Sequence, residues 1–160
     1  MQESNRPVIG VIPARWASTR LPGKSLVSIC GKPLIQWVVE SARRSTRLAR
    51  LVVATDDTRI REAVERLGVE AVMTRRDHPS GTDRVAEAVA QIPAEVIINI
   101  QGDEPLIDPA LIDLLADRML ADESWDMTTA AVPIDRDEDR DNPSVVKVVT
   151  DRDGRALYFS

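Results

Sequence analysis

The sequence predicts a three-layer α/β fold with a mostly parallel β-sheet and helices on both faces. Short runs of β-branched residues alternate along the chain with segments whose apolar residues recur at helical spacing. Glycine and proline turn signals separate the two kinds of segment. With 160 residues, 43% of them hydrophobic, the chain is long enough to bury one substantial core. We therefore expect a single nucleotide-binding domain over residues 1–160, with residues 1–6 disordered.

The expected strands are short runs of β-branched and other apolar residues. The run at 96–100 is the most strand-like of them, and the last two runs flank a turn at 151–154, which predicts a β-hairpin. In chain order the expected strands are Val8–Ile12, Leu51–Thr55, Ala71–Met73, Val96–Ile100, Met127–Val132, Val145–Val149 and Arg155–Phe159.

Four segments combine helical spacing with helix start or stop signals. Pro33 and Pro109 each suit the first turn of a helix, Asp108 is an N-cap, and Gly68 is a stop signal. The expected helices are 33–44, Thr58–Leu67, Asp83–Gln91, and one after Asp108 with Leu111, Leu114, Leu115 and Met119 facing inward. The charged run 135–141 is expected to be a solvated loop.

The loop that follows the first strand carries three cations, Arg15, Arg20 and Lys24, among small residues. Small side chains let backbone N–H groups approach phosphate oxygens, and the cations offset the negative charge of the phosphates. Ligands of parallel α/β sheets bind off the carboxyl ends of the strands, where the loops Pro13–Lys24 and Gln101–Pro105 are expected to emerge. The sequence therefore predicts a nucleotide-handling site at this edge.

Residues 23–25, Gly-Lys-Ser, also match the end of a P-loop. The first glycine of that motif would fall at Ser18, and Pro22 lacks an N–H donor that a P-loop uses to wrap phosphate. No clean helix start follows Lys24. We therefore favour a phosphate-binding loop of another kind.

Asp103 follows a buried strand directly, beside Gly102, which allows close approach of the backbone. A carboxylate at the carboxyl end of a strand is suited to hold a Mg²⁺ ion that bridges substrate phosphates. The alternative is an acidic turn before Pro105. We expect Asp103 to be the metal ligand.

Composition limits the partners and the compartment. Acidic residues outnumber basic ones by 26 to 21, giving a net charge of −5, so a basic surface for nucleic acid is not expected. Cys30 is the only cysteine, which fits a reducing compartment. The N-terminal residues have no apolar signal-peptide core, and no uncharged apolar run reaches membrane-spanning length. We expect a cytoplasmic protein that binds neither nucleic acid nor membranes.

Four sequence blocks, in order along the chain, resemble the sugar-acid cytidylyltransferases, and among them the CMP-Kdo synthetases (3-deoxy-manno-octulosonate cytidylyltransferases). The blocks are Ile12–Arg15 with Ala17–Lys24 and Gly31–Leu34, then His78–Arg84, then Asn99–Pro105, then Asn142–Val149 with Ala156–Ser160. The resemblance runs from Val8 to the last residue, so it is more specific than any single motif. It implies a Rossmann-like nucleotidyltransferase fold.

The resemblance also implies roles for single residues. Arg15 and Lys24 would bind the triphosphate and the departing pyrophosphate, and with Asp103 they form the expected catalytic set. Ser80 and Arg84 would contact cytidine and its ribose, with Gln101 beside the base, although Ser80 is also a plausible helix cap. The other expected CTP-binding residues lie in the first loop: Pro13, Ala14, Ser18, Thr19 and Arg20. We expect His78, the only histidine, to be a loop residue that nothing orients.

The implied reaction joins CTP and 3-deoxy-manno-octulosonate (Kdo) to give CMP-Kdo and pyrophosphate, by Mg²⁺-assisted attack of the anomeric hydroxyl on the α-phosphate. The family continues past this point and supplies a second metal-binding aspartate there, so we expect a truncated copy whose activity on its own is open. The resemblance further implies a homodimer and a role in lipopolysaccharide assembly. Two alternatives stay open: a cytidylyltransferase for another acidic sugar, such as a nonulosonate, and a catalytically inactive nucleotide-binding module.

Overall fold

The computed structural model describes residues 7–17 and 21–160, which form two compact units. The first unit reaches to Thr128, and the second is Thr129–Ser160. The disorder expected in residues 1–6 lies outside the described residues, as do the expected CTP-binding residues Ser18, Thr19 and Arg20. Two compact units do not by themselves make two domains, and the single domain expected over residues 1–160 stays a prediction.

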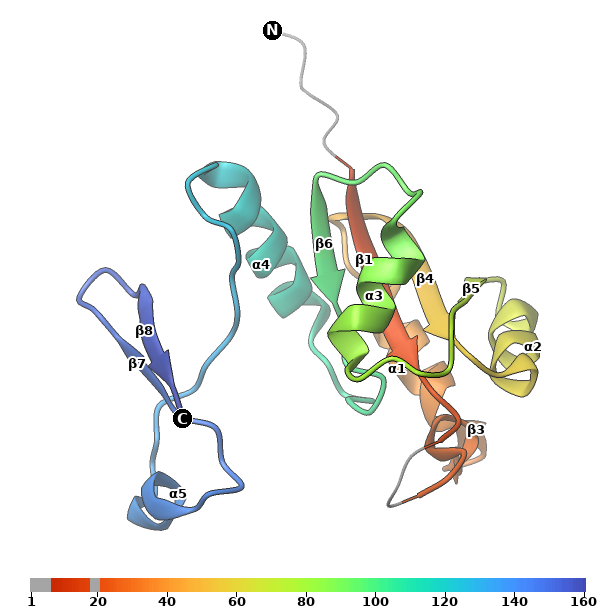
Figure 1. The fold of residues 1–160 in the computed structure, drawn as a ribbon, viewed down its shortest axis with the longest axis horizontal. Helices are drawn as coiled ribbons and strands as arrows, with labels where there is room; N and C mark the ends of the chain where they lie inside the picture. Colours follow the sequence, from red (N-terminus) through yellow and green to blue (C-terminus); the bar gives the residue numbers. More distant parts are fainter. Residues whose placement is uncertain (1–6, 18–20) are drawn as a thin grey trace, which may run out of the picture. The chain divides into compact units, whose positions relative to one another are not determined.

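The centre of the first unit is a parallel sheet of four strands in the order β5-β4-β1-β6 (Figure 1). Its strands are β1 (Val8–Ala14), β4 (Leu48–Thr55), β5 (Glu70–Met73) and β6 (Val96–Asn99). The side chains of β1 are buried on both faces, as expected of a continuous apolar run in the middle of a parallel sheet. The predicted α/β class with a parallel sheet is confirmed.

Helices cover both faces of this sheet (Figure 1). They are α1 (Leu34–Ala42), α2 (Thr58–Arg66), α3 (Gly81–Val89) and α4 (Pro109–Ala121). Alternate residues of β1 point to opposite faces. Ile12 belongs to the core cluster that includes Ile35 of α1, whereas Val11 belongs to the cluster that includes Val85 of α3. Helices α1, α2 and α4 therefore pack on one face, and α3 packs on the other.

The strand order places a topological switch point beside β1. The chain adds β4 and then β5 on one side of β1 and afterwards crosses to add β6 on the other side. Ligands of open α/β sheets bind where the strand order reverses, outside the carboxyl ends of the strands. The loops that leave β1 and β6 therefore flank the expected binding crevice.

Strand β1 extends two residues further than predicted, through Pro13 to Ala14. Pairing with β6 ends at Val11 and Asn99, whereas pairing with β4 continues to Ala14. The missing N–H of Pro13 falls on the β6 side, where the ladder has ended, so the proline costs no ladder hydrogen bond.

Between β1 and α1 lie a short 3₁₀ turn and a small antiparallel hairpin, which are η1 (Lys24–Leu26), β2 (Ser28–Ile29) and β3 (Lys32–Pro33). The Gly-Lys-Ser residues thus open a three-residue 3₁₀ turn, and the next α-helix begins only at Leu34. This geometry agrees with the rejection of a P-loop, which feeds directly into an α-helix.

Three further expectations differ from the structure. Leu114 of α4 is 52% exposed, because Ile112 and Ala116 take the inward face of the helix. Residues 127–132 were expected to be a strand, but no described strand pairs with them, and they have no regular structure. The charged run was expected to be a loop, but it contains the short exposed helix α5 (Asp137–Asp141), which its own ion pairs support.

The second unit contains the predicted hairpin. Strands β7 (Val148–Thr150) and β8 (Ala156–Phe159) pair antiparallel, and Gly154 adopts φ +85° in the turn between them. Within the described residues, no helix combines the length and apolar composition needed to cross a bilayer.

Candidate functional site

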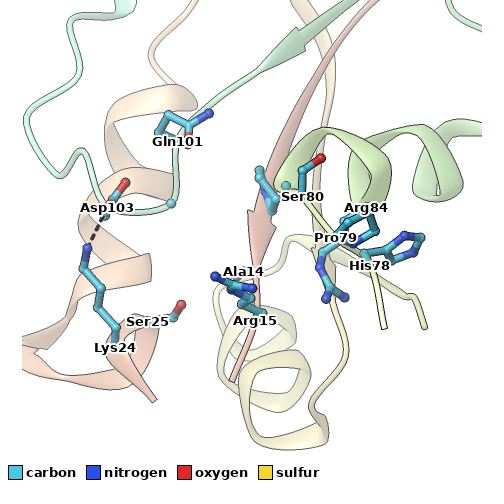
Figure 2. Close-up of a pocket in the computed structure, with 13 residues that line it drawn as sticks. Ala14, Arg15, Lys24, Ser25, His78, Pro79, Ser80, Arg84, Gln101 and Asp103 are labelled. Carbon is cyan, nitrogen blue, oxygen red and sulfur yellow. Dashed lines mark hydrogen bonds and ion pairs between the residues drawn. The ribbon is translucent and has the colours of Figure 1, made fainter. Parts of the chain in front are cut away.

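A cavity of about 270 Å³ lies at the carboxyl ends of β1 and β6 (Figure 2). It is lined by Pro13, Ala14, Arg15, Lys24, Ser25, His78, Pro79, Ser80, Gly81, Arg84, Gln101, Gly102 and Asp103. Every predicted CTP-binding residue that the structure describes is in this set. Residues from three distant parts of the sequence therefore meet at the switch point, and their binding roles stay predictions.

The shape of the cavity depends on a close approach between the loop after β6 and the end of β1. A Cβ atom at Gly102 would lie 2.8 Å from the carbonyl oxygen of Pro13, closer than real Cβ atoms come to such an atom. Glycine is therefore required for this packing. The close approach anticipated from the sequence is present, and its partner is the end of β1.

Lys24 and Asp103 face each other on one side of the cavity (Figure 2). The Lys24 Nζ donates to Asp103 Oδ2 at 2.6 Å, and the two side chains are 41% and 51% exposed. An ion pair this exposed contributes only about 0–1 kcal/mol to stability. A ligand that offers an anion to the ammonium and a cation to the carboxylate can therefore separate the pair at little cost.

The loop between β1 and η1 is closed by contacts between its two ends. The amide of Gly23 donates to the carbonyl of Trp16 at 2.9 Å, and Gly23 adopts φ +70° with the Trp16 ring packed against it. The guanidinium of Arg59, from α2, lies 3.2 Å from the centre of the same ring. These contacts hold Arg15 and Lys24 at the two ends of one closed loop.

Ser80 lies on the other side of the cavity, where it caps α3. Its hydroxyl accepts from the amide of Asp83 at 3.1 Å and also bonds to the Asp83 carboxylate. The helix-cap interpretation of Ser80 is therefore realised in the structure. Contact between Ser80 and a nucleotide stays a prediction.

Arg84 lines the same side but is only 2% exposed. Its guanidinium donates to the Thr74 hydroxyl, to the carbonyl of Arg75 at 3.0 Å, and to the Asp56 carboxylate at 3.1 Å. The sequence analysis assigns no role to Asp56. Its position directly after the buried strand β4, at the same edge as Asp103, was the available signal.

The expectation that nothing orients His78 is wrong. The ring is buried and bonds through Nε2 to the carboxylate of Glu87 on α3, which also accepts from the amide of Arg75. Partial burial raises the pKa of Glu87, but the hydrogen bonds from His78 and Arg75 outweigh it, so the pKa lies below its usual value. Glu87 therefore stays charged and fixes the ring at the rim of the cavity.

The donors available to a metal ion are few. Among residues 7–17 and 21–160, no group of three or more His, Cys, Asp or Glu side chains is placed to hold a metal, and Asp103 is the only carboxylate in the described lining. Mg²⁺ commonly binds through one or two carboxylates together with substrate phosphates. The cavity therefore suits a magnesium ion that arrives with a polyphosphate better than one held by protein groups alone.

Comparison with known proteins places these features in context. The model of the family described as "Cytidylyltransferase" matches residues 9–160. The 3-deoxy-manno-octulosonate cytidylyltransferase of Pseudomonas fluorescens is 55% identical over 153 residues, a match that covers 94% of this chain and 60% of the relative. The enzyme of the same name from Syntrophobacter fumaroxidans is 51% identical over 156 residues, covering 96% of this chain and 62% of the relative.

Solved structures agree with these matches. A CMP:2-keto-3-deoxy-manno-octonic acid synthetase in complex with CTP superposes with a TM-score of 0.86 at 44% identity, over 96% of this chain and 64% of that one. A cytidylyltransferase from Leptospira borgpetersenii gives a TM-score of 0.67 at 27% identity, over 74% of this chain and 50% of that one. The chain spans about 60% of the length of the curated relatives it matches.

Proposed function

This chain belongs to the cytidylyltransferase family, and from that premise we propose that it takes part in transfer of the cytidylyl group of CTP to Kdo, giving CMP-Kdo and pyrophosphate. The resemblance to CMP-Kdo synthetases drawn from the sequence blocks is confirmed by the matched relatives and the matched structure. We propose the reaction, its substrates and the roles of the single residues.

One observation carries the proposal. Lys24 and Asp103 are 79 positions apart in the sequence, yet they meet at 2.6 Å on one cavity at the switch point of the sheet. Nucleotidyl transfer needs cations along the triphosphate and a metal ligand close to the α-phosphate, because catalysis is mostly positioning and charge stabilisation. This pair supplies one group of each kind at the same place.

The other lining residues fit the parts of CTP. Arg15 suits bidentate contact with phosphate, and Lys24 suits a point-charge contact. The amide of Gln101 offers both a donor and an acceptor to cytosine, which presents an amino donor and two acceptors. A guanidinium has five N–H donors, and Arg84 uses three on the protein, which leaves two for a ribose hydroxyl.

We assign Mg²⁺ to Asp103 together with the phosphates of CTP. When bound there, the ion would neutralise charge on the phosphates and polarise the α-phosphorus. Asp103 itself would keep the ion on the Gln101 side of the cavity, opposite the helix that carries Ser80. The proposal also includes a cytoplasmic homodimer whose product feeds lipopolysaccharide assembly.

A second candidate is a nucleotide-binding module without transfer activity. It is favoured by the cavity lining, in which Asp103 is the only carboxylate among the described residues. In this case CTP binding would persist, and the reaction would need further metal ligands from elsewhere.

Two assays separate these possibilities. Pyrophosphate release is measured with CTP and Mg²⁺ in the presence of Kdo or of N-acetylneuraminate, and nucleotide affinity is measured by calorimetry with CTP, ATP and GTP. Release with Kdo supports the proposal, and faster release with N-acetylneuraminate would assign the other acidic sugar. Binding of CTP in preference to ATP and GTP without release would assign the inactive module. Equal affinity for all three nucleotides would contradict a cytidine site.

A further inference from the structure

Asp56 connects two elements that approach the cavity from different sides. It follows β4 directly, and its side chain is only 6% exposed. One carboxylate oxygen, Oδ1, accepts from the backbone amide of Trp16 at 3.1 Å. The other, Oδ2, accepts from the Arg84 guanidinium at 3.1 Å. Trp16 directly follows Arg15 in the first loop, and Arg84 belongs to α3.

The Arg84 end of this connection is also fixed. The Thr74 hydroxyl that receives one guanidinium N–H donates in turn to the carbonyl of Thr55, the last residue of β4. The amide of Thr74 donates to the same carbonyl at 2.8 Å. The guanidinium is therefore held between the ends of β4 and β5, with Asp56 as its only carboxylate partner among the described residues.

We infer that Asp56 is a positioning residue that sets the spacing between the Arg15 loop and α3, and thereby the width of the CTP site; this inference rests on the proposed function. A buried carboxylate whose two oxygens bond to two different elements fixes their separation. Without it, the buried Arg84 charge has no opposite charge beside it among the described residues, and the Trp16 amide loses its acceptor. We therefore expect the Arg15 loop and α3, which both line the cavity, to shift when Asp56 is lost.

The sharpest variant is Asp56→Asn, because asparagine keeps the shape of the side chain but has only one acceptor oxygen. It can satisfy the Trp16 amide or the Arg84 guanidinium, and not both. The matched control is Asp113→Asn. Asp113 also accepts several hydrogen bonds, from Ser45, Thr46 and Arg47, but these residues do not line the cavity.

Two readouts are measured on both variants and on the unaltered chain. The first is hydrogen exchange of the Trp16 amide by NMR, which needs no ligand. The second is the dissociation constant of CTP by calorimetry. We expect Asp56→Asn to speed Trp16 exchange at least tenfold and to weaken CTP binding at least fivefold, whereas Asp113→Asn leaves both within twofold.

The outcomes separate this inference from the proposed function. If the unaltered chain does not bind CTP, the proposed function fails, and the Trp16 exchange rate alone decides whether Asp56 holds the loop. Unchanged Trp16 exchange in Asp56→Asn would overturn the inference. Unchanged CTP affinity in that variant, in a chain that binds CTP, would overturn it as well. If Asp56→Asn unfolds, Asp56→Glu, which keeps the charge beside Arg84, is tested by the same two readouts.

Discussion

At the amino edge of the sheet, Asp113 accepts hydrogen bonds from three successive residues of the turn before β4, whereas at the carboxyl edge Asp103 forms an exposed ion pair with Lys24. Partial burial raises the pKa of Asp113, but the hydrogen bonds from Ser45, Thr46 and Arg47 outweigh it and lower the pKa to about 2. The Asp103 side chain is 51% exposed.

The difference shows how the same residue type serves two purposes. The oxygens of Asp113 are occupied by protein donors that fasten the turn before β4 to α4, so little capacity is left for a ligand. Asp103 keeps most of its acceptor capacity and faces a cavity. Among the described residues its ion-pair partner is Lys24, itself a group that phosphate can bind. We therefore expect changes at the amino edge to alter stability, and changes at the carboxyl edge to alter ligand binding and catalysis.

The largest expected effect is that of Asp103→Asn on transfer. Asp103 is the only carboxylate among the described residues that line the cavity and the metal ligand we propose, so we expect its loss to lower pyrophosphate release with CTP and Kdo on the order of 10³-fold. CTP affinity should fall less, because the phosphate-binding cations remain. Glu104→Gln is the matched control, since Glu104 is a neighbouring acid outside the described lining. Release by Asp103→Asn at the unaltered rate would refute the metal role.

Lys24→Met should weaken CTP binding about 10- to 100-fold, the range expected for loss of a charge-assisted hydrogen bond. Its thermal stability should stay close to that of the unaltered chain, because the ion pair with Asp103 is exposed. Lys32→Met serves as the control, since Lys32 pairs with Glu40 and lies over the Trp37 ring, away from the cavity. Equal losses of CTP affinity in both variants, measured by calorimetry, would show that general charge and not the cavity binds the nucleotide.

Asp113→Ala should have the opposite effect to Lys24→Met: the variant should lose stability and keep its affinity for CTP. Loss of the acceptor leaves the amides of Thr46 and Arg47 and the hydroxyl of Ser45 without their partner, and we expect the free energy of unfolding to fall by about 1–2 kcal/mol. Denaturant unfolding measures the loss of stability, and calorimetry should give an unchanged CTP affinity. A variant as stable as the unaltered chain, but impaired in CTP binding, would break the distinction between the two edges.

The smallest expected effect is a pH dependence of stability at the amino edge. The pKa of Asp113 is about 2 in the folded chain, below its ordinary value of 3.8, so its charged form favours the folded state. This contribution is complete above about pH 4 and is lost as the pH falls toward 2. With a discount for solvent screening it amounts to about 1 kcal/mol. The difference in unfolding free energy between the unaltered chain and Asp113→Ala should therefore shrink as the pH is lowered from 5 to 2.5. A difference that stays constant would contradict the lowered pKa of Asp113.

The sequence predicted the parts of the fold that depend on local signals. Apolar runs located the strands of the parallel sheet, and the caps at Asp108 and Gly68 located helix ends. It also placed Arg15, Lys24 and Asp103 near one another, because the carboxyl ends of parallel strands share one edge.

The parts that were missed depend on contacts between distant residues. Asp56 bonds to Trp16 and Arg84, which are 40 and 28 positions away, and no local pattern reveals such partners. The His78–Glu87 contact exists because a loop returns against α3. Residues 127–132 have the composition of a strand, yet a strand also needs a neighbour to pair with, and the described residues offer none.

The most direct test of a shared CTP site is a ¹⁵N–¹H NMR titration of the chain with CTP and Mg²⁺. We expect chemical-shift changes at amides of both walls of the cavity, in residues 14–15, 24–25, 80–81 and 101–103, with the Thr46 and Arg47 amides unchanged. Shifts confined to one wall, or concentrated at the turn before β4, would contradict a single site formed by the loops after β1 and β6.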